Sequence, residues 1–147
     1  MATSKWITST RGTAGLISIL TTELNALANN AGVTTATIEN NTTLDQYADF
    51  ELVVTYGTAP TADTTVDLYI VRSIDGTNYE DASATRPTPE FVGSFVLDNV
   101  TTAQRKIVRG VMLPPTSFRL LIVNKSGQAM AATGNTLRGD FYNHQVV

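Results

Sequence analysis

Cysteine is absent from the 147-residue sequence, and histidine occurs once, at His144. Without cysteine the chain can have no disulfide, no thiolate nucleophile and no zinc–thiolate site. A single imidazole cannot build the usual histidine-based metal cluster, and a Ser–His–acid triad would depend on a residue close to the chain end, where backbones usually fray. We therefore predict no catalytic residue, no metal site and no cofactor, and we expect that the protein is not an enzyme.

Paired carboxylates are the remaining route to catalysis, because two of them suffice for glycoside cleavage. Asp45, Asp49 and Glu51 lie close together in the sequence, and a second acidic group falls within residues 75–81. Nothing marks one of these carboxyl groups as kept neutral by burial, which a general acid needs. The first group fits the solvated face of a strand, and the second fits a hairpin turn better than a calcium loop.

Long apolar runs are also missing, and charged residues make up only 16% of the sequence. No stretch of 18 or more apolar residues is present and the first residues are too polar for a signal peptide, so we expect neither a membrane partner nor export by that route. The net charge of −3 argues against nucleic acid as a partner. Residues 1–100 carry a net charge of −8, and residues 101–147 carry a net charge of +5. This division suits contacts between an acidic and a basic surface of neighbouring copies. The alternative is that both segments interleave in one sheet and the charges mix in space.

The first part of the chain has a pattern of its own. Residues 1–15 are small and polar, which is typical of an extended arm. Ile17, Leu20, Leu24 and Leu27 then recur at helical spacing, and residues 29–32 end the stripe with a glycine suited to a helix C-cap. The pattern predicts an arm followed by one short α-helix within residues 1–32.

From residue 33 onward the sequence has the period and turn residues of β-strands. Even-numbered residues from 48 to 56 are apolar, so we expect that face to be buried, and residues 118–123 are almost continuously apolar, as in a central strand. Strands are predicted near residues 33–39, 46–56, 65–73, 91–98, 105–112, 117–124 and 135–143. The fold class is therefore all-β, with a single antiparallel, jelly-roll-like β-sandwich over residues 33–147.

Two groups of residues are candidates for contacts with other proteins. The segment 104–109 is strongly basic, which fits either the polar side of an amphipathic strand or an electrostatic contact with an acidic neighbour. The arm and helix would lie on a neighbouring subunit. The predicted interface residues are Trp6, Ile7, Arg11, Ile17, Leu20 and Leu24 in the arm and helix, and Arg105, Lys106 and Arg109 in the basic strand.

A lectin-like function would need exposed aromatic rings as platforms for sugars. Trp6 is the only tryptophan and lies in the predicted arm. Tyr69, Tyr79, Phe141 and Tyr142 mostly occupy positions typical of a sandwich core. Sugar binding is therefore an alternative that the sequence permits without indicating it.

Four segments, residues 22–30, 73–79, 109–115 and 123–129, resemble in order and spacing a group of small phage and prophage proteins described as virion structural proteins. The resemblance implies a component of the virion, assembled in the host cytoplasm. It also implies the major capsid protein or other virion proteins as partners, and a homo-oligomer on the particle.

Three functions are compatible with these patterns. The first is a capsid decoration or cement protein that bridges capsomers and stabilises the head, with affinity gained from many symmetric copies. The second is a tail or neck component, such as an adaptor ring. The third is a carbohydrate-binding module for the host surface.

Overall fold

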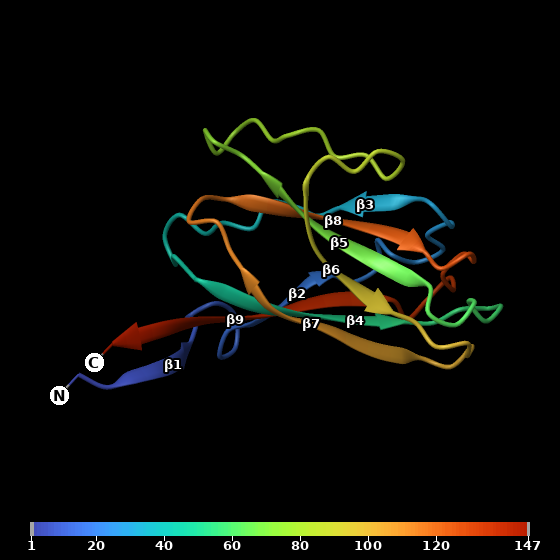
Figure 1. Ribbon diagram of the computed structural model, residues 1–147, viewed down its shortest axis with the longest axis horizontal. Helices are drawn as coiled ribbons and strands as arrows, with labels where there is room; N and C mark the ends of the chain where they lie inside the picture. The colour runs from blue at the N-terminus through green and yellow to red at the C-terminus, as the bar shows by residue number, and fades with distance from the viewer. Residues whose placement is uncertain (1, 147) are drawn as a thin grey trace.

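The computed structural model describes residues 2–146, which form nine β-strands in two antiparallel sheets (Figure 1). Residues 1 and 147, at the ends of the predicted ranges 1–32 and 33–147, lie outside this description. The strands are β1 (Ser4–Thr8), β2 (Leu16–Leu20), β3 (Gly32–Thr34), β4 (Tyr47–Val54), β5 (Thr65–Arg72), β6 (Glu90–Val96), β7 (Gln104–Met112), β8 (Phe118–Lys125) and β9 (Thr136–Val146).

The strand order is that of a jelly roll. Sheet A has the order β1–β9–β4–β7, with β2 also paired to β9, and sheet B has the order β3–β8–β5–β6. Strands from the first half of the sequence therefore pair with strands from the second half: β2 pairs with β9, β3 with β8, β4 with β7 and β5 with β6. The all-β class and the antiparallel sandwich were predicted, and the wiring is jelly-roll-like.

β1 and β2 share one edge of sheet A. The backbone N–H of Ser9 donates to the carbonyl of Phe141 at 2.9 Å, and the N–H of Phe141 donates to the carbonyl of Gly15 at 3.0 Å. Residues 10–14 therefore form a loop that interrupts a single edge strand. Gly15 has φ +88°, and a Cβ there would lie 2.4 Å from the Phe141 carbonyl oxygen, so glycine is required at this close approach.

The core lies between the two sheets. Ala48, Phe50, Leu52 and Val54 of β4 are fully buried, so the predicted even-numbered face is confirmed. These side chains face apolar side chains of β5 and β8 in sheet B. The predicted central strand at residues 118–123 is also confirmed, because β8 pairs with both β3 and β5.

The two sheets differ in how their outer faces are covered. On sheet B, Tyr69, Val71, Leu121 and Val123 form a second small core with side chains from the long β5–β6 connection, including Tyr79. On sheet A, the odd-numbered residues of β4 are only half-buried. Within residues 2–146, sheet A therefore has an open outer face, and sheet B does not.

The predicted short α-helix is wrong. Leu16–Leu20 form strand β2, and residues 21–31 form turns in which Ala26 and Asn30 have positive φ values of 56° and 62°. Leu20 and Leu24 still reach the core, which explains the misleading spacing. β2 pairs with β9 over residues 16–20, with a register shift between Ser18 and Leu20, and its half-buried β-branched Ile17 and Ile19 alternate with the exposed Leu16 and Ser18 as in a strand.

Candidate functional site

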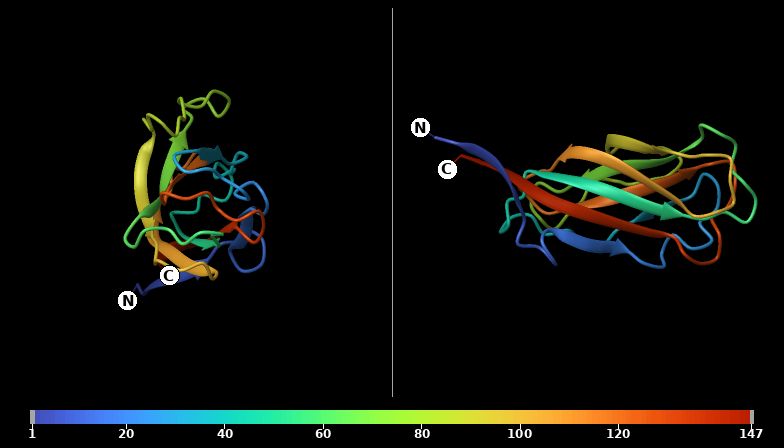
Figure 2. Two further views of the ribbon diagram at one scale, coloured as in Figure 1. Left: turned by 90° about the vertical axis from the view of Figure 1, so that its right-hand side faces the viewer. Right: turned by 90° about the horizontal axis from the view of Figure 1, so that it is seen from below.

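β1 and the end of β9 form a two-stranded ribbon that extends beyond the body of the sandwich, with the two ends of the chain side by side (Figures 1 and 2). The register places Trp6 opposite His144 and Ile7 opposite Asn143. The segment predicted to be a free arm thus supplies a strand to sheet A of its own chain.

Four aromatic side chains gather on the open face of sheet A where this ribbon meets the body. Tyr47 and Tyr142 are cross-strand partners, with ring centroids 5.9 Å apart and an interplanar angle of 19°. Trp6 contacts both edge-on, at 5.5 Å from Tyr47 and 5.4 Å from Tyr142, and lies 5.0 Å from the ring of His144. The indole is nevertheless 62% exposed. These four residues are called the aromatic cluster below.

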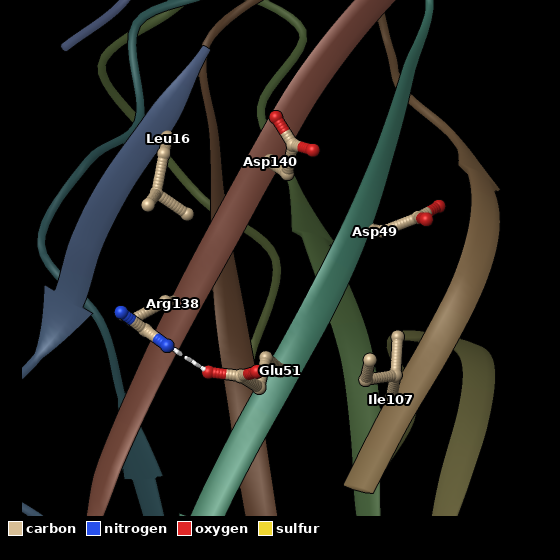
Figure 3. A pocket seen from close by; sticks show the side chains of 6 residues that line it. All are labelled: Leu16, Asp49, Glu51, Ile107, Arg138 and Asp140. Carbon is tan, nitrogen blue, oxygen red and sulfur yellow. Dashed lines mark hydrogen bonds and ion pairs between the residues drawn. The ribbon is translucent and has the colours of Figure 1, made fainter. Parts of the chain in front are cut away.

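An acidic pocket of about 290 Å³ also lies on the outer face of sheet A, lined by side chains of β2, β4, β7 and β9 (Figure 3). Asp49 of β4 and Asp140 of β9 are direct cross-strand partners, and Leu16 and Ile107 form apolar walls. Partial burial and the charge of Asp49 raise the pKa of Asp140. Two like charges opposite each other are unfavourable for folding, so this pair is an unusual arrangement for a purely structural surface.

Asp49 also links the pocket to the aromatic cluster. Its Oδ1 accepts hydrogen bonds from the hydroxyl of Tyr142 at 3.0 Å and from the N–H of Gly110 at 2.8 Å. Burial, followed by this hydrogen bond and the charge of Asp49, raises the pKa of Tyr142 to about 12. The Tyr142 ring is therefore fixed in place and stays neutral over the physiological range.

The predicted basic strand is β7, and two of its cations already have partners. Arg105 Nη1 lies 2.6 Å from Glu51, which also binds Arg138, and Lys106 Nζ lies 2.6 Å from Asp98. Burial alone would raise the pKa of Glu51, but the hydrogen bonds from the two arginines outweigh it and hold the pKa below its usual range. Among residues 2–146, the side chain of Arg109 has no ion-pair partner.

Arg109 lies where β6 of sheet B meets β7 of sheet A, a line of contact that we call the β6–β7 seam. The strands approach so closely that a Cβ on Gly93 would lie 2.6 Å from a methyl group of Val108. Two large apolar side chains are exposed at the seam, Phe91 at 56% and Met112 at 70%. Together with Arg109 they line a shallow groove of about 240 Å³.

The remaining predicted interface residues contribute to the fold of the chain itself. Leu20 and Leu24 are core residues, and Ile17 packs partly buried against them. Arg11 donates hydrogen bonds to Asp45 and Asn40, and its guanidinium lies 4.9 Å from the ring centroid of Phe141. Its side chain is only 11% exposed. Trp6 is therefore the member of the arm-and-helix group with a largely exposed side chain.

The aromatic cluster was not predicted from the sequence, because Tyr142 was expected at a core position. In β9, Leu137 and Phe141 point inward, so the period-two alternation turns Tyr142 outward. That signal was present in the sequence. No group of three or more His, Cys, Asp or Glu side chains suited to a metal ion occurs among residues 2–146. In the same range, no helix is long and apolar enough to cross a membrane.

Comparison with known proteins gives similarity only at the level of three-dimensional structure. No protein-family model and no curated protein sequence matches the chain. Among solved structures, the CBM36-1 domain of a multidomain xylanase from the hindgut metagenome of Trinervitermes trinervoides matches with a TM-score of 0.44 and 14% identity, covering 99% of this chain and 97% of that domain.

Two viral structures also match. A chain of infectious bursal disease virus, Gx strain, has a TM-score of 0.41 and 16% identity over 97% of this chain, which spans only 32% of the viral chain. A chain of turnip yellow mosaic virus has a TM-score of 0.37 and 14% identity over 100% of this chain and 82% of that chain. None of these likenesses assigns the protein to a family.

Proposed function

We propose that the protein is a structural component of a bacteriophage particle, a decoration protein seated on the head through the β6–β7 seam. The observation that carries the proposal is the combination of Arg109, without an ion-pair partner among residues 2–146, with exposed Phe91 and Met112 at one sheet edge. The resemblance of four sequence segments to phage virion proteins supports the same conclusion.

The chemistry of the seam suits a protein–protein contact. Arginine, methionine and aromatic residues are enriched in the centres of such interfaces, and lysine and glutamate are depleted there. Among residues 2–146, β7 has only β4 as a hydrogen-bonded neighbour, so it is one of the two edges of sheet A. An open edge that ends beside exposed apolar side chains is costly for an isolated protein, and a bound partner removes that cost.

Charge at the seam bears on the partner. Lys106 is paired with Asp98, Arg105 shares Glu51 with Arg138, and Glu90 of the groove is paired with Arg72, which leaves Arg109 as the cation of β7 without an ion-pair partner among residues 2–146. We expect an acidic residue of the capsid surface to pair with its planar guanidinium. A tail or neck component would use the same seam, and its location on the particle distinguishes it from a head decoration.

The test is add-back to particles that lack the protein. Purified wild-type chain should bind such heads, and Arg109→Glu and Met112→Ala should bind at least about tenfold more weakly, which corresponds to about 1.4 kcal/mol for each change. Arg86→Glu is the matched control, because Arg86 is exposed on the β5–β6 connection and undergoes the same charge reversal. Equal binding of Arg109→Glu and Arg86→Glu contradicts attachment through the β6–β7 seam. Failure of the wild-type chain to bind heads contradicts the function.

A further inference from the structure

A second surface, on the open outer face of sheet A, has the features of a ligand site. It adjoins the β6–β7 seam, because Met112 is the cross-strand partner of Tyr47. The aromatic cluster and the acidic pocket lie along β9 on the open face of sheet A, and Trp6 belongs to the edge of the sheet opposite β7. Neither group is used in the proposed attachment to the head. We propose that this face binds a neutral oligosaccharide, stacked on Trp6 and hydrogen-bonded to Asp49 and Asp140.

Trp6 provides the apolar part of the site. An indole that is 62% exposed gains little from folding, yet its edge-on contacts with Tyr47, Tyr142 and His144 hold it in one orientation. The face of an aromatic ring carries partial negative charge. It therefore attracts the positively polarised C–H groups on the apolar face of a pyranose ring. A ring that is ordered before binding loses little side-chain entropy when the sugar arrives.

Asp49 and Asp140 provide the polar part. The Oδ1 atom of Asp49 accepts hydrogen bonds from Tyr142 and Gly110, and its Oδ2 atom has no hydrogen-bond partner among residues 2–146. The carboxylate of Asp140 likewise makes no side-chain hydrogen bond within that range, although it lines the pocket (Figure 3). Ionised carboxylates accept strong hydrogen bonds from hydroxyl groups. The hydroxyl groups of a sugar are donors of this kind.

The spacing along β9 indicates a ligand longer than one sugar. Outward-facing positions of this strand carry His144, Tyr142 and Asp140 in succession. From position 144, opposite Trp6, to position 140 the strand advances about 13 Å, because each residue adds about 3.3 Å. The rings and carboxylates are thus laid out along the strand, so we expect a ligand that runs along it and is longer than one pyranose ring.

The charge of the pocket disfavours anionic sugars. Glu51 is paired with Arg105 and with Arg138, which also lines the pocket, but the carboxylates of Asp49 and Asp140 have no ion-pair partner within the described chain. A uronate or sialate would meet two like charges in the pocket, which is unfavourable. A neutral glycan brings only hydroxyl and amide groups to these acceptors.

The experiment uses the intrinsic fluorescence of the chain, because Trp6 is its only tryptophan. Wild-type protein is titrated with four neutral tetrasaccharides, each added up to about 10 mM so that millimolar affinities can be detected. They are maltotetraose, cellotetraose, mannotetraose and tetra-N-acetylchitotetraose. Tetragalacturonate is titrated in parallel. At least one neutral tetrasaccharide should change the emission saturably, and tetragalacturonate should not. No saturable change with any of the four, or an equal response to tetragalacturonate, overturns the proposal.

Two variants test the assigned contacts by isothermal titration calorimetry with the sugar that binds. Trp6→Ala and Asp140→Ala should each weaken binding by at least about tenfold, and Ile74→Ala should not, because Ile74 is fully exposed on the distant β5–β6 connection. Circular dichroism checks that all three variants fold. Wild-type affinity in Trp6→Ala contradicts the site. Loss of sugar binding leaves attachment to heads unaffected, so this inference and the proposed function fail independently.

Discussion

Replacing Arg11 with alanine should be one of the most destabilising single changes in this chain. The guanidinium of Arg11 donates to Asp45, Asn40 and Thr43, and so ties the loop between β1 and β2 to the segment that leads into β4. The side chains of Arg11 and Asp45 are only 11% and 1% exposed. The Asp45 carboxylate is therefore largely shielded from water by Arg11, and Asn143 Nδ2 is another side-chain donor to it, at 3.1 Å.

The magnitude follows from this burial. Removal of one partner of a buried ion pair leaves an uncompensated charge and costs about 3–5 kcal/mol, whereas an exposed pair contributes about 0–1 kcal/mol. Arg72→Ala is the matched control, because the side chains of Arg72 and Glu90 form an ion pair at 2.6 Å that is about half exposed. We expect Arg11→Ala to lower the free energy of unfolding by about 3 kcal/mol and Arg72→Ala by less than about 1 kcal/mol.

The pH dependence gives a second readout. Burial alone would raise the pKa of Asp45, but hydrogen bonds led by Arg11 outweigh it and hold the pKa below its usual value. The wild-type pair therefore stabilises the fold above about pH 4, and this contribution is lost as the pH falls through the folded-state pKa. In Arg11→Ala the carboxyl becomes easier to protonate, so the difference from wild type should shrink between pH 7 and pH 3.

Urea unfolding followed by circular dichroism at both pH values measures these differences. Asp45→Asn in the Arg11→Ala background should recover part of the loss, because the neutral amide costs less to bury than an unpaired carboxylate. A cost of Arg11→Ala that matches Arg72→Ala, or that is the same at pH 7 and pH 3, would show that the Arg11–Asp45 pair does not stabilise the fold as a buried ion pair.

Three further predictions concern sheet A. Asp140→Asn should stabilise the protein by about 0.2–1 kcal/mol at pH 7 and have no effect at pH 3. The pKa of Asp140 is raised in the folded chain, so ionisation of this carboxyl opposes folding. Urea unfolding at both pH values measures the difference. Asp49→Asn should lower the pKa of Tyr142 from about 12 toward the usual value, measured by NMR titration of ring-labelled tyrosine. Gly139→Ala should cost about 1–3 kcal/mol in thermal unfolding, since its Cβ would lie 2.7 Å from the Phe141 ring.

Strand positions and buried faces could be predicted where the sequence has a clear period. The alternation around Phe50 and Leu52 identified the buried face of β4, and the apolar run around Leu121 identified a central strand. Both signals are local, because each strand of a sandwich must bury one face or both. Glycine and proline residues indicated the turns between the strands.

The helix error has a physical cause in the connection between β2 and β3. Leu20, Leu24 and Leu27 do face the core, but the turns around them are held by distant groups. Asn124 donates to the carbonyls of Leu27 and Ala28 at 3.0 Å and 3.3 Å, and the N–H of Ala26 donates to Ala131 at 2.9 Å. These partners come from the other end of the chain, so spacing within residues 17–27 could not reveal them.

The candidate surfaces needed the strand order. Arg105 and Arg138 lie on different strands, and only the placement of β4 between β7 and β9 brings both to Glu51. The same order brings Asp49 and Asp140 together and places Trp6 against Tyr47 across β9. The sequence indicated a basic strand and a lone tryptophan, and it did not indicate which cations stay available or which rings meet.

Cryo-electron microscopy of the intact phage particle would show whether the chain is attached to the head through the β6–β7 seam. We expect many copies on the outside of the head lattice, with Arg109 and Met112 against the capsid protein and Trp6 facing the solvent. A few copies in a ring at the neck or along the tail, or copies on the head whose seam faces the solvent, would contradict it.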